Sequence, residues 1–106
     1  MYRQGDVLLV SIQRTQLPAH LAPQDRDALG RLALANGEAS GHAHVVSSPA
    51  AELLADPEEV DQRFLVLATE ALLTHEEHAS IPLPAGTYQV VRQREYTAIA
   101  DRDVLD

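Results

Sequence analysis

The sequence predicts an all-β fold, a small barrel or sandwich of about six short strands with little helix. Short apolar or alternating runs are separated by turn signals rich in Gly, Pro and Asn, at intervals too close for long helices. A length of 106 residues with 45% hydrophobic residues suits one core. We therefore expect residues 1–106 to form a single barrel-like domain.

The N-terminal half contains one apolar run and one hairpin signal. Residues 5–12 are apolar and β-branched, which predicts a buried strand. Residues 14–30 contain prolines and a charged run and are typical of a surface loop. Residues 31–35 alternate and lead into Asn36-Gly37, the pair that most strongly favours a hairpin because both residues tolerate positive φ. Residues 42–47 are the expected returning strand.

The C-terminal half contains two clear strands and one ambiguous segment. Residues 63–68 and 86–96 have strand patterns. The Glu, Ala and Leu of residues 70–78 favour a helix, whereas the surrounding short strands favour a strand that ends in a turn; we prefer the strand. The prolines in residues 81–86 exclude a helix interior or a central strand. Residues 101–105 would add a short edge strand.

The charge of the chain limits its partners. Sixteen carboxylates face eight arginines, for a net charge of −8, which disfavours a protein that binds nucleic acid by neutralising phosphates. No apolar run approaches the roughly 20 residues needed to cross a bilayer, and no signal-peptide pattern opens the chain. With no cysteine there is no disulfide or thiolate site. We expect a cytoplasmic protein without a membrane partner, as a monomer or homodimer.

Four of the five histidines lie in two short clusters, which predict a metal site. His42 and His44 alternate on a predicted strand, so their rings project from one face about 7 Å apart. His75 and His78 are three residues apart and can act together only where the chain leaves the strand. Neutral imidazoles suit Zn²⁺, Fe²⁺, Ni²⁺ or Mn²⁺. The expected cofactor is therefore one divalent transition metal.

Carboxylates beside the second cluster extend the prediction to catalysis. Glu76 or Glu77 could act as a general base on metal-bound water if the ion keeps an open coordination position. A closed set of four histidines would be structural instead. Two readings without metal also stay open: hydrogen-bonded surface histidines, and histidine with glutamate as acid and base. With a metal bound, the chain would be a binding domain or a metalloenzyme.

A second polar concentration lies in the second half of the strand predicted over residues 86–96. Arg92, Arg94 and Tyr96 fall on one face and could bind a small or anionic substrate, or form a solvated surface paired with carboxylates. Residues 52–77 hold eight carboxylates and one arginine. An alternative function is therefore a metal-free interaction or regulatory module that binds a basic protein partner through this acidic stretch.

Two resemblances accompany these motifs. Gly37-x3-Gly41-His42-x-His44 with later histidines resembles the metal site of the cupins, which implies a small β-barrel with His42, His44 and either His75 or His78 as ligands. The wider pattern resembles a small, functionally uncharacterised family of bacterial β-proteins. Its marks are the opening Tyr2-Arg-Gln-Gly-Asp-Val-Leu-Leu9, Gly41-His-Ala-His44, Thr74-His-Glu-Glu-His78, Leu83-Pro-Ala-Gly-Thr-Tyr88 and Arg92-Gln-Arg-Glu-Tyr96. That resemblance implies no activity.

Overall fold

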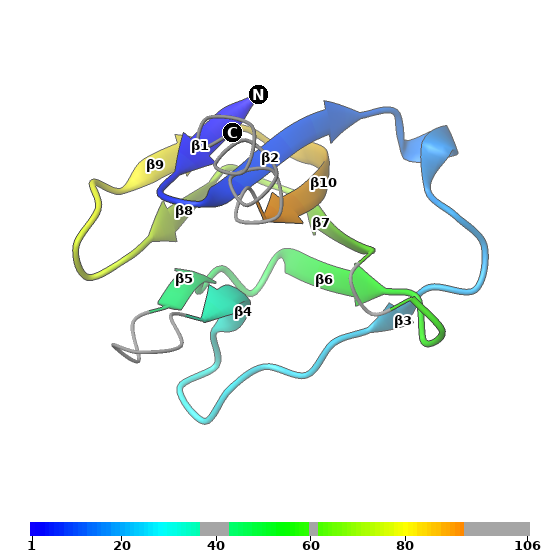
Figure 1. The fold of residues 1–106 in the computed structure, drawn as a ribbon, viewed down its shortest axis with the longest axis horizontal. Helices are drawn as coiled ribbons and strands as arrows, with labels where there is room; N and C mark the ends of the chain where they lie inside the picture. The colour runs from blue at the N-terminus through cyan, green and yellow to red at the C-terminus, as the bar shows by residue number, and fades with distance from the viewer. Residues whose placement is uncertain (37–42, 60–61, 93–106) are drawn as a thin grey trace, which may run out of the picture.

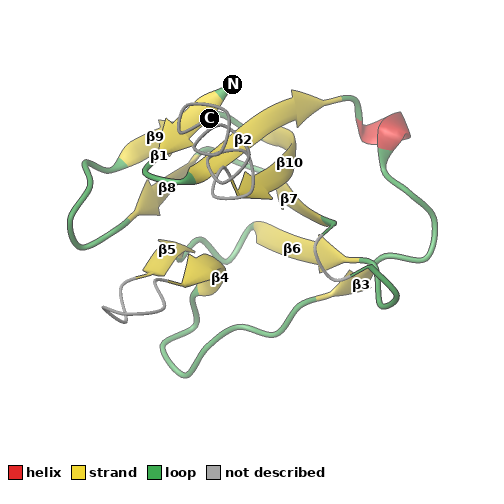
Figure 2. Ribbon diagram, viewed as in Figure 1, coloured by secondary structure: helices red, strands yellow, loops and turns green. Residues whose placement is uncertain are grey.

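A computed structural model describes residues 1–36, 43–59 and 62–92. These residues form ten strands and one 3₁₀ turn, arranged as two antiparallel sheets (Figures 1 and 2). The strands are β1 (Tyr2–Gln4), β2 (Val7–Ile12), β3 (Ala22–Pro23), β4 (Leu32–Asn36), β5 (Ala43–Val46), β6 (Ala51–Ala55), β7 (Arg63–Leu67), β8 (Ala71–Thr74), β9 (Ile81–Leu83) and β10 (Gly86–Arg92), and the 3₁₀ turn is η1 (Arg14–Gln16). The predicted all-β class is confirmed.

The larger sheet has the strand order β1-β2-β10-β7-β6-β3 and the smaller sheet has the order β4-β5-β8-β9. Their facing sides bury one apolar core, to which alternate residues of the strands contribute, including Leu9, Leu65, Leu73, Leu83 and Tyr88. In the described residues the sheets do not close into a barrel, so the fold is the sandwich form of the prediction. The strand number exceeds six because β1, β3 and β9 have only two or three residues each, too few for alternation to reveal them.

The chain begins with a tight hairpin, whose turn is formed by the first two residues of the predicted strand over 5–12. Gln4 pairs with Val7, so the turn consists of Gly5 and Asp6 alone. Gly5 has a φ of +58° and Asp6 has a negative φ, the pattern of a type II′ turn with glycine at its first central position. Residues 5–6 therefore leave the predicted strand, and Asp6 projects from a turn.

The ambiguous segment 70–78 is a strand that ends in a turn, as preferred. β8 pairs with β5 through Val45 and Thr74, and with β9 on its other side. The backbone leaves the sheet after Thr74 and bends through residues 76–78. Pro82 lies in β9 at the edge of its sheet, where a missing backbone N–H is tolerated.

The Gln4 side chain joins the two sheets at one corner. It is 2% exposed, and its Nε2 donates to the Leu73 carbonyl at 3.0 Å and to the Ala79 carbonyl at 2.8 Å. Elsewhere Arg63 of β7 donates to the Leu34 carbonyl of β4. The β1–β2 turn, β5 and the β8–β9 connection thereby meet at one end of the molecule, the left of Figure 1, away from η1.

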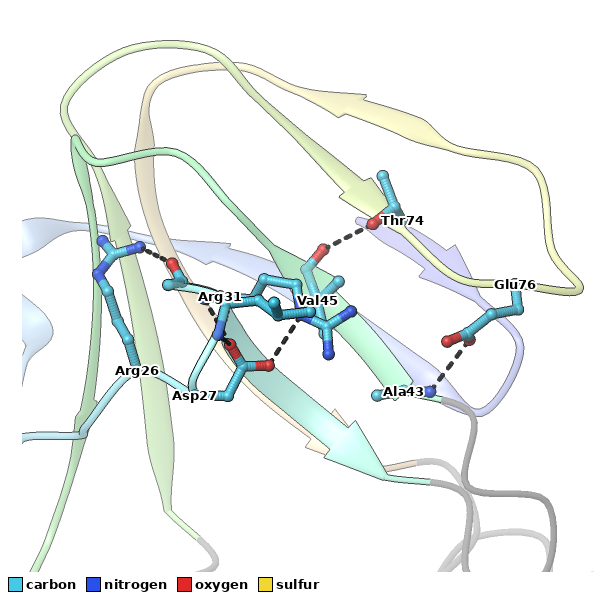
Figure 3. A network of polar contacts seen from close by, with 9 residues as sticks. Arg26, Asp27, Arg31, Ala43, Val45, Thr74 and Glu76 are labelled. Carbon is cyan, nitrogen blue, oxygen red and sulfur yellow. Dashed lines mark hydrogen bonds and ion pairs between the residues drawn. The ribbon is translucent and has the colours of Figure 1, made fainter.

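The predicted loop over residues 14–30 crosses the surface, with only η1 and β3 as regular structure. Arg26 anchors it by donating to the carbonyls of Gly30, Ser48 and Ala51, and Asp27 pairs with Arg31 at 2.8 Å (Figure 3). The described part of the chain contains no helix long and apolar enough to span a membrane. The turn of the β4–β5 hairpin and the predicted strand over 101–105 lie outside the described residues.

Candidate functional site

Three histidine rings from two distant segments lie against one another at the corner fixed by Gln4. The ring centroid of His44 lies 4.3 Å from that of His75 and 5.9 Å from that of His78, and the last two are 4.6 Å apart. His44 is 5% exposed, His75 is half-buried and His78 is exposed. The cluster therefore runs from the protein interior to solvent. Of the first predicted histidine cluster, His44 thus meets both members of the second, and His42 lies outside the described residues.

The hydrogen bond from His44 to Gln4 determines which ring nitrogen carries a proton. His44 Nδ1 lies 2.9 Å from Gln4 Oε1. The Gln4 amide cannot be turned round, because its nitrogen already donates to two backbone carbonyls. Oε1 can only accept, so Nδ1 must donate. In the neutral imidazole the remaining nitrogen, Nε2, then has a free lone pair.

Asp6 faces this second nitrogen. His44 Nε2 lies 3.2 Å from Asp6 Oδ1, and the other carboxylate oxygen, Oδ2, accepts from Arg92 Nη2 at 3.2 Å. Burial of Asp6 raises its pKa, but the hydrogen bond and charge of Arg92, the backbone N–H of Asp6 and the charge of His44 together hold the pKa of Asp6 below its ordinary value. A carboxylate thus faces a nitrogen that carries no proton when His44 is neutral.

Burial also favours the neutral form of His44. It lowers the pKa of His44 below its ordinary value, and the neighbouring His75 lowers it further, as does His78. The charge of Asp6 opposes these effects only in part. In the neutral form two acceptors face each other, Nε2 and the Asp6 carboxylate. A cation between them would remove the conflict.

The second histidine segment is shaped by its own backbone. The Glu77 N–H donates to His75 Nδ1 at 3.0 Å, so Nδ1 is the acceptor of that ring. Nε2 is therefore the nitrogen that carries a proton or binds a ligand. Glu76 Oε2 accepts from the Ala43 N–H at 3.2 Å and ties the segment to the start of β5 (Figure 3). Of the two predicted bases, Glu76 therefore lies beside β5, and Glu77 lies on the exposed part of the bend.

Several predicted site residues fall outside the described residues: His42, Arg94 and Tyr96. Arg92 is described and contacts the histidine cluster through Asp6. Within residues 1–36, 43–59 and 62–92, no three His, Asp or Glu side chains surround a common point as metal ligands do. The rings of His44 and His78 instead lie nearly parallel, with 14° between their planes.

Sequence reasoning misses Gln4, Gly5 and Asp6. A Cβ on Gly5 would lie 2.7 Å from His78 Nε2 and 3.2 Å from His44 Cε1, so only glycine allows the turn to approach the rings this closely. The available signal is Gln4-Gly5-Asp6 itself, which lies in the opening family mark and places a glycine and a short polar residue directly before an apolar run.

We expect the lowered pKa of His44 to appear as a loss of stability in mild acid. The unfolded histidine titrates near 6.5. Below that pH the unfolded chain binds a proton that the folded chain resists, so the free energy of unfolding falls as pH drops from 6.5 toward the folded pKa, and His44 adds no further change below it.

Urea unfolding between pH 8 and pH 5 in EDTA measures this effect. His44→Gln should flatten the change in midpoint. His20→Asn, at an exposed loop position with positive φ, is the control for the loss of one histidine. Identical pH profiles for wild type and His44→Gln would contradict the prediction.

A comparison with protein families identifies the family of the chain. The model of a family described as Domain of unknown function (DUF8820) matches residues 3–93. The chain belongs to this family. No curated protein and no solved structure matches the chain. The DUF8820 match includes the β1–β2 turn, His44, His75, His78 and Arg92, so the whole described site lies within the family domain.

Proposed function

We propose that this DUF8820 domain binds one divalent transition metal ion, Zn²⁺, Fe²⁺, Ni²⁺ or Mn²⁺, through His44, His75 and His78. The observation that carries the proposal is the convergence of the three rings. A metal 2.0–2.1 Å from each imidazole nitrogen in tetrahedral geometry places ring centroids about 5 Å apart. The observed separations of 4.3, 4.6 and 5.9 Å lie on both sides of this value.

The surroundings of His44 support the same proposal. A metal-binding histidine usually donates its other N–H to a fixed acceptor, and Gln4 is such an acceptor. Two ligand atoms on one tetrahedral ion are about 3.3 Å apart, close to the 3.2 Å between His44 Nε2 and Asp6 Oδ1. Asp6 is therefore a candidate fourth ligand, besides the predicted His42.

Binding requires the two outer rings to turn. His75 and His78 must rotate until a nitrogen of each faces the edge shared by His44 and Asp6. Both side chains are more exposed than His44, so rotation displaces little of the core. His44 stays fixed by Gln4 and provides the first ligand, and the others close around the ion.

An open coordination position would make the site catalytic. A metal ion there would lower the pKa of a bound water, and Glu76 or Glu77 would serve as general base. Glu76 is the better placed of the two because it contacts the backbone of β5 next to His44. The resemblance of His42-x-His44 to the cupin site belongs to this proposal and not to the fold, which in the described residues is an open sandwich.

Metal analysis of protein purified without a histidine tag tests the proposal. After incubation with Zn²⁺, Ni²⁺, Mn²⁺ or Fe²⁺ and dialysis, we expect one equivalent of at least one metal. His44→Ala and His78→Ala should each weaken binding at least about 10-fold, by loss of a ligand. The control is His20→Asn, which changes a histidine in the surface loop.

Two results would contradict metal binding: less than a tenth of an equivalent with all four metals, or equal losses in His20→Asn and His44→Ala. The alternative interaction module would then gain support. A basic protein partner captured by the wild type, released by salt and retained by His44→Ala would identify it.

A further inference from the structure

Arg92 provides a second cationic group beside the proposed metal site. It pairs with Val7 across β10 and β2, which places it next to the β1–β2 turn. Its Nη2 donates to Asp6 Oδ2, while Asp6 Oδ1 faces His44 Nε2. One carboxylate therefore holds the arginine and the histidine on its two oxygens, so the guanidinium and the proposed metal position are neighbours.

The Arg92 guanidinium has N–H donors that no acceptor among the described residues uses. An arginine carries five N–H donors, and in the described residues only Nη2 has an acceptor. Nε is buried without any acceptor there, although the side chain as a whole is 27% exposed. Buried donors without acceptors are exceptions in native proteins and call for an explanation. A ligand oxygen that arrives on binding would be such an acceptor.

The charges also favour an anion. Asp6 and Arg92 balance each other, and the three imidazoles are neutral when they bind a metal. A divalent ion would then add two positive charges next to Arg92. Of the other carboxylates near the histidines, Glu76 accepts from the Ala43 N–H and Glu77 lies on the exposed bend, in a chain whose net charge is −8. A small anion with two oxygens could place one on the metal and direct the other at Arg92, as guanidinium groups bind carboxylates and phosphates.

We propose that the metal ion and Arg92 together bind a small oxyanion, a carboxylate or a phosphate group. This inference rests on the proposed metal site and adds the class of its ligand. Asp6 then has a further role, because it positions the guanidinium toward the metal. Arg92 acts on the anion and is not a metal ligand.

The test uses Co²⁺, whose visible absorption changes when a new ligand enters its coordination shell. The Co²⁺-loaded protein is titrated with acetate and, separately, with inorganic phosphate. We expect a saturable change with at least one anion. The anion that binds more tightly identifies the ligand class, carboxylate or phosphate. Co²⁺ affinity is measured first for each variant, and every anion titration uses fully loaded protein. Arg92→Gln should then weaken anion binding at least about 10-fold, and Arg92→Lys should weaken it less, because lysine keeps the charge but cannot donate two parallel hydrogen bonds as a guanidinium does.

Arg14→Gln, at an exposed position in η1 at the other end of the molecule, is the matched control and should behave as wild type. Circular dichroism confirms that each variant is folded. No spectral change with either anion, or equal anion affinity in Arg92→Gln and wild type, would overturn the oxyanion inference and leave the metal site standing. Absence of Co²⁺ binding by the wild type would instead overturn both.

Discussion

Replacing Gln4 with leucine should lower the free energy of unfolding by about 3–5 kcal/mol. The substitution keeps a side chain of similar size in a position that is 2% exposed, but it removes three hydrogen bonds. The Leu73 carbonyl and the Nδ1–H of His44 each lose a buried partner, at about 1–3 kcal/mol per group, and the carbonyl of the exposed Ala79 loses a partner that water can replace. Urea unfolding measures the loss.

Two control variants separate the loss of stability caused by the missing hydrogen bonds from any effect of leucine itself. Gln24→Leu removes one bond from an exposed glutamine and should change stability by less than about 1 kcal/mol. Gln4→Glu keeps the shape and the acceptor for His44 but turns a carboxylate oxygen toward the two carbonyls. It should therefore also destabilise the fold at neutral pH. A Gln4→Leu protein as stable as Gln24→Leu would show that the corner is held by packing alone.

Gln4→Leu should also weaken metal binding at the proposed site. Without Gln4 the His44 ring can turn and can exchange the proton between its nitrogens, so Nε2 is no longer presented as a free lone pair. Loss of a partner that orients a metal-binding histidine typically weakens metal binding by about 10–100-fold. Measured at temperatures where the variant is still folded, this effect separates the role of Gln4 in the site from its role in stability.

The strands that the sequence predicts best are those with enough residues to show a period. The apolar run containing β2, the strand β7 and the pattern of β10 each extend over five residues or more, and the Asn36-Gly37 signal stands at the β4–β5 connection. β1 is missed because three residues cannot establish alternation. The type II′ turn after it is missed because a single glycine next to an apolar run also fits the start of a strand.

The candidate site was predictable where its residues are chemically conspicuous. His44, His75 and His78 stand out because histidines are few, and the strand that ends at Thr74 lets the last two rings meet. Gln4 and Asp6 do not stand out. Gln4 lies 40 residues from the histidine that it orients and 75 from one of the carbonyls that fix it. Sheet pairing creates such contacts, and no local pattern encodes them.

Gly5→Ala should disturb the histidine cluster more than the fold. Alanine at a φ of +58° costs about 1–2 kcal/mol in backbone strain. Its Cβ would also lie 2.7 Å from His78 Nε2 and 3.2 Å from His44 Cε1. His78 is exposed and can swing away at small cost, but His44 is buried and held by Gln4. The main expected result is therefore a displaced His78 and metal binding at least about 10-fold weaker.

Gly30→Ala is the matched control for this prediction. Gly30 has a φ of +78°, and a Cβ there would meet no atom of the described residues within 4 Å. It carries the same kind of backbone strain without the contact, so both variants should lose about 1–2 kcal/mol of stability in urea unfolding. Only Gly5→Ala should lose metal affinity, measured by calorimetric titration with Zn²⁺. Equal affinities in the two variants would mean that His78 binds no metal at this corner, because the close approach of the β1–β2 turn would then have no effect on the site.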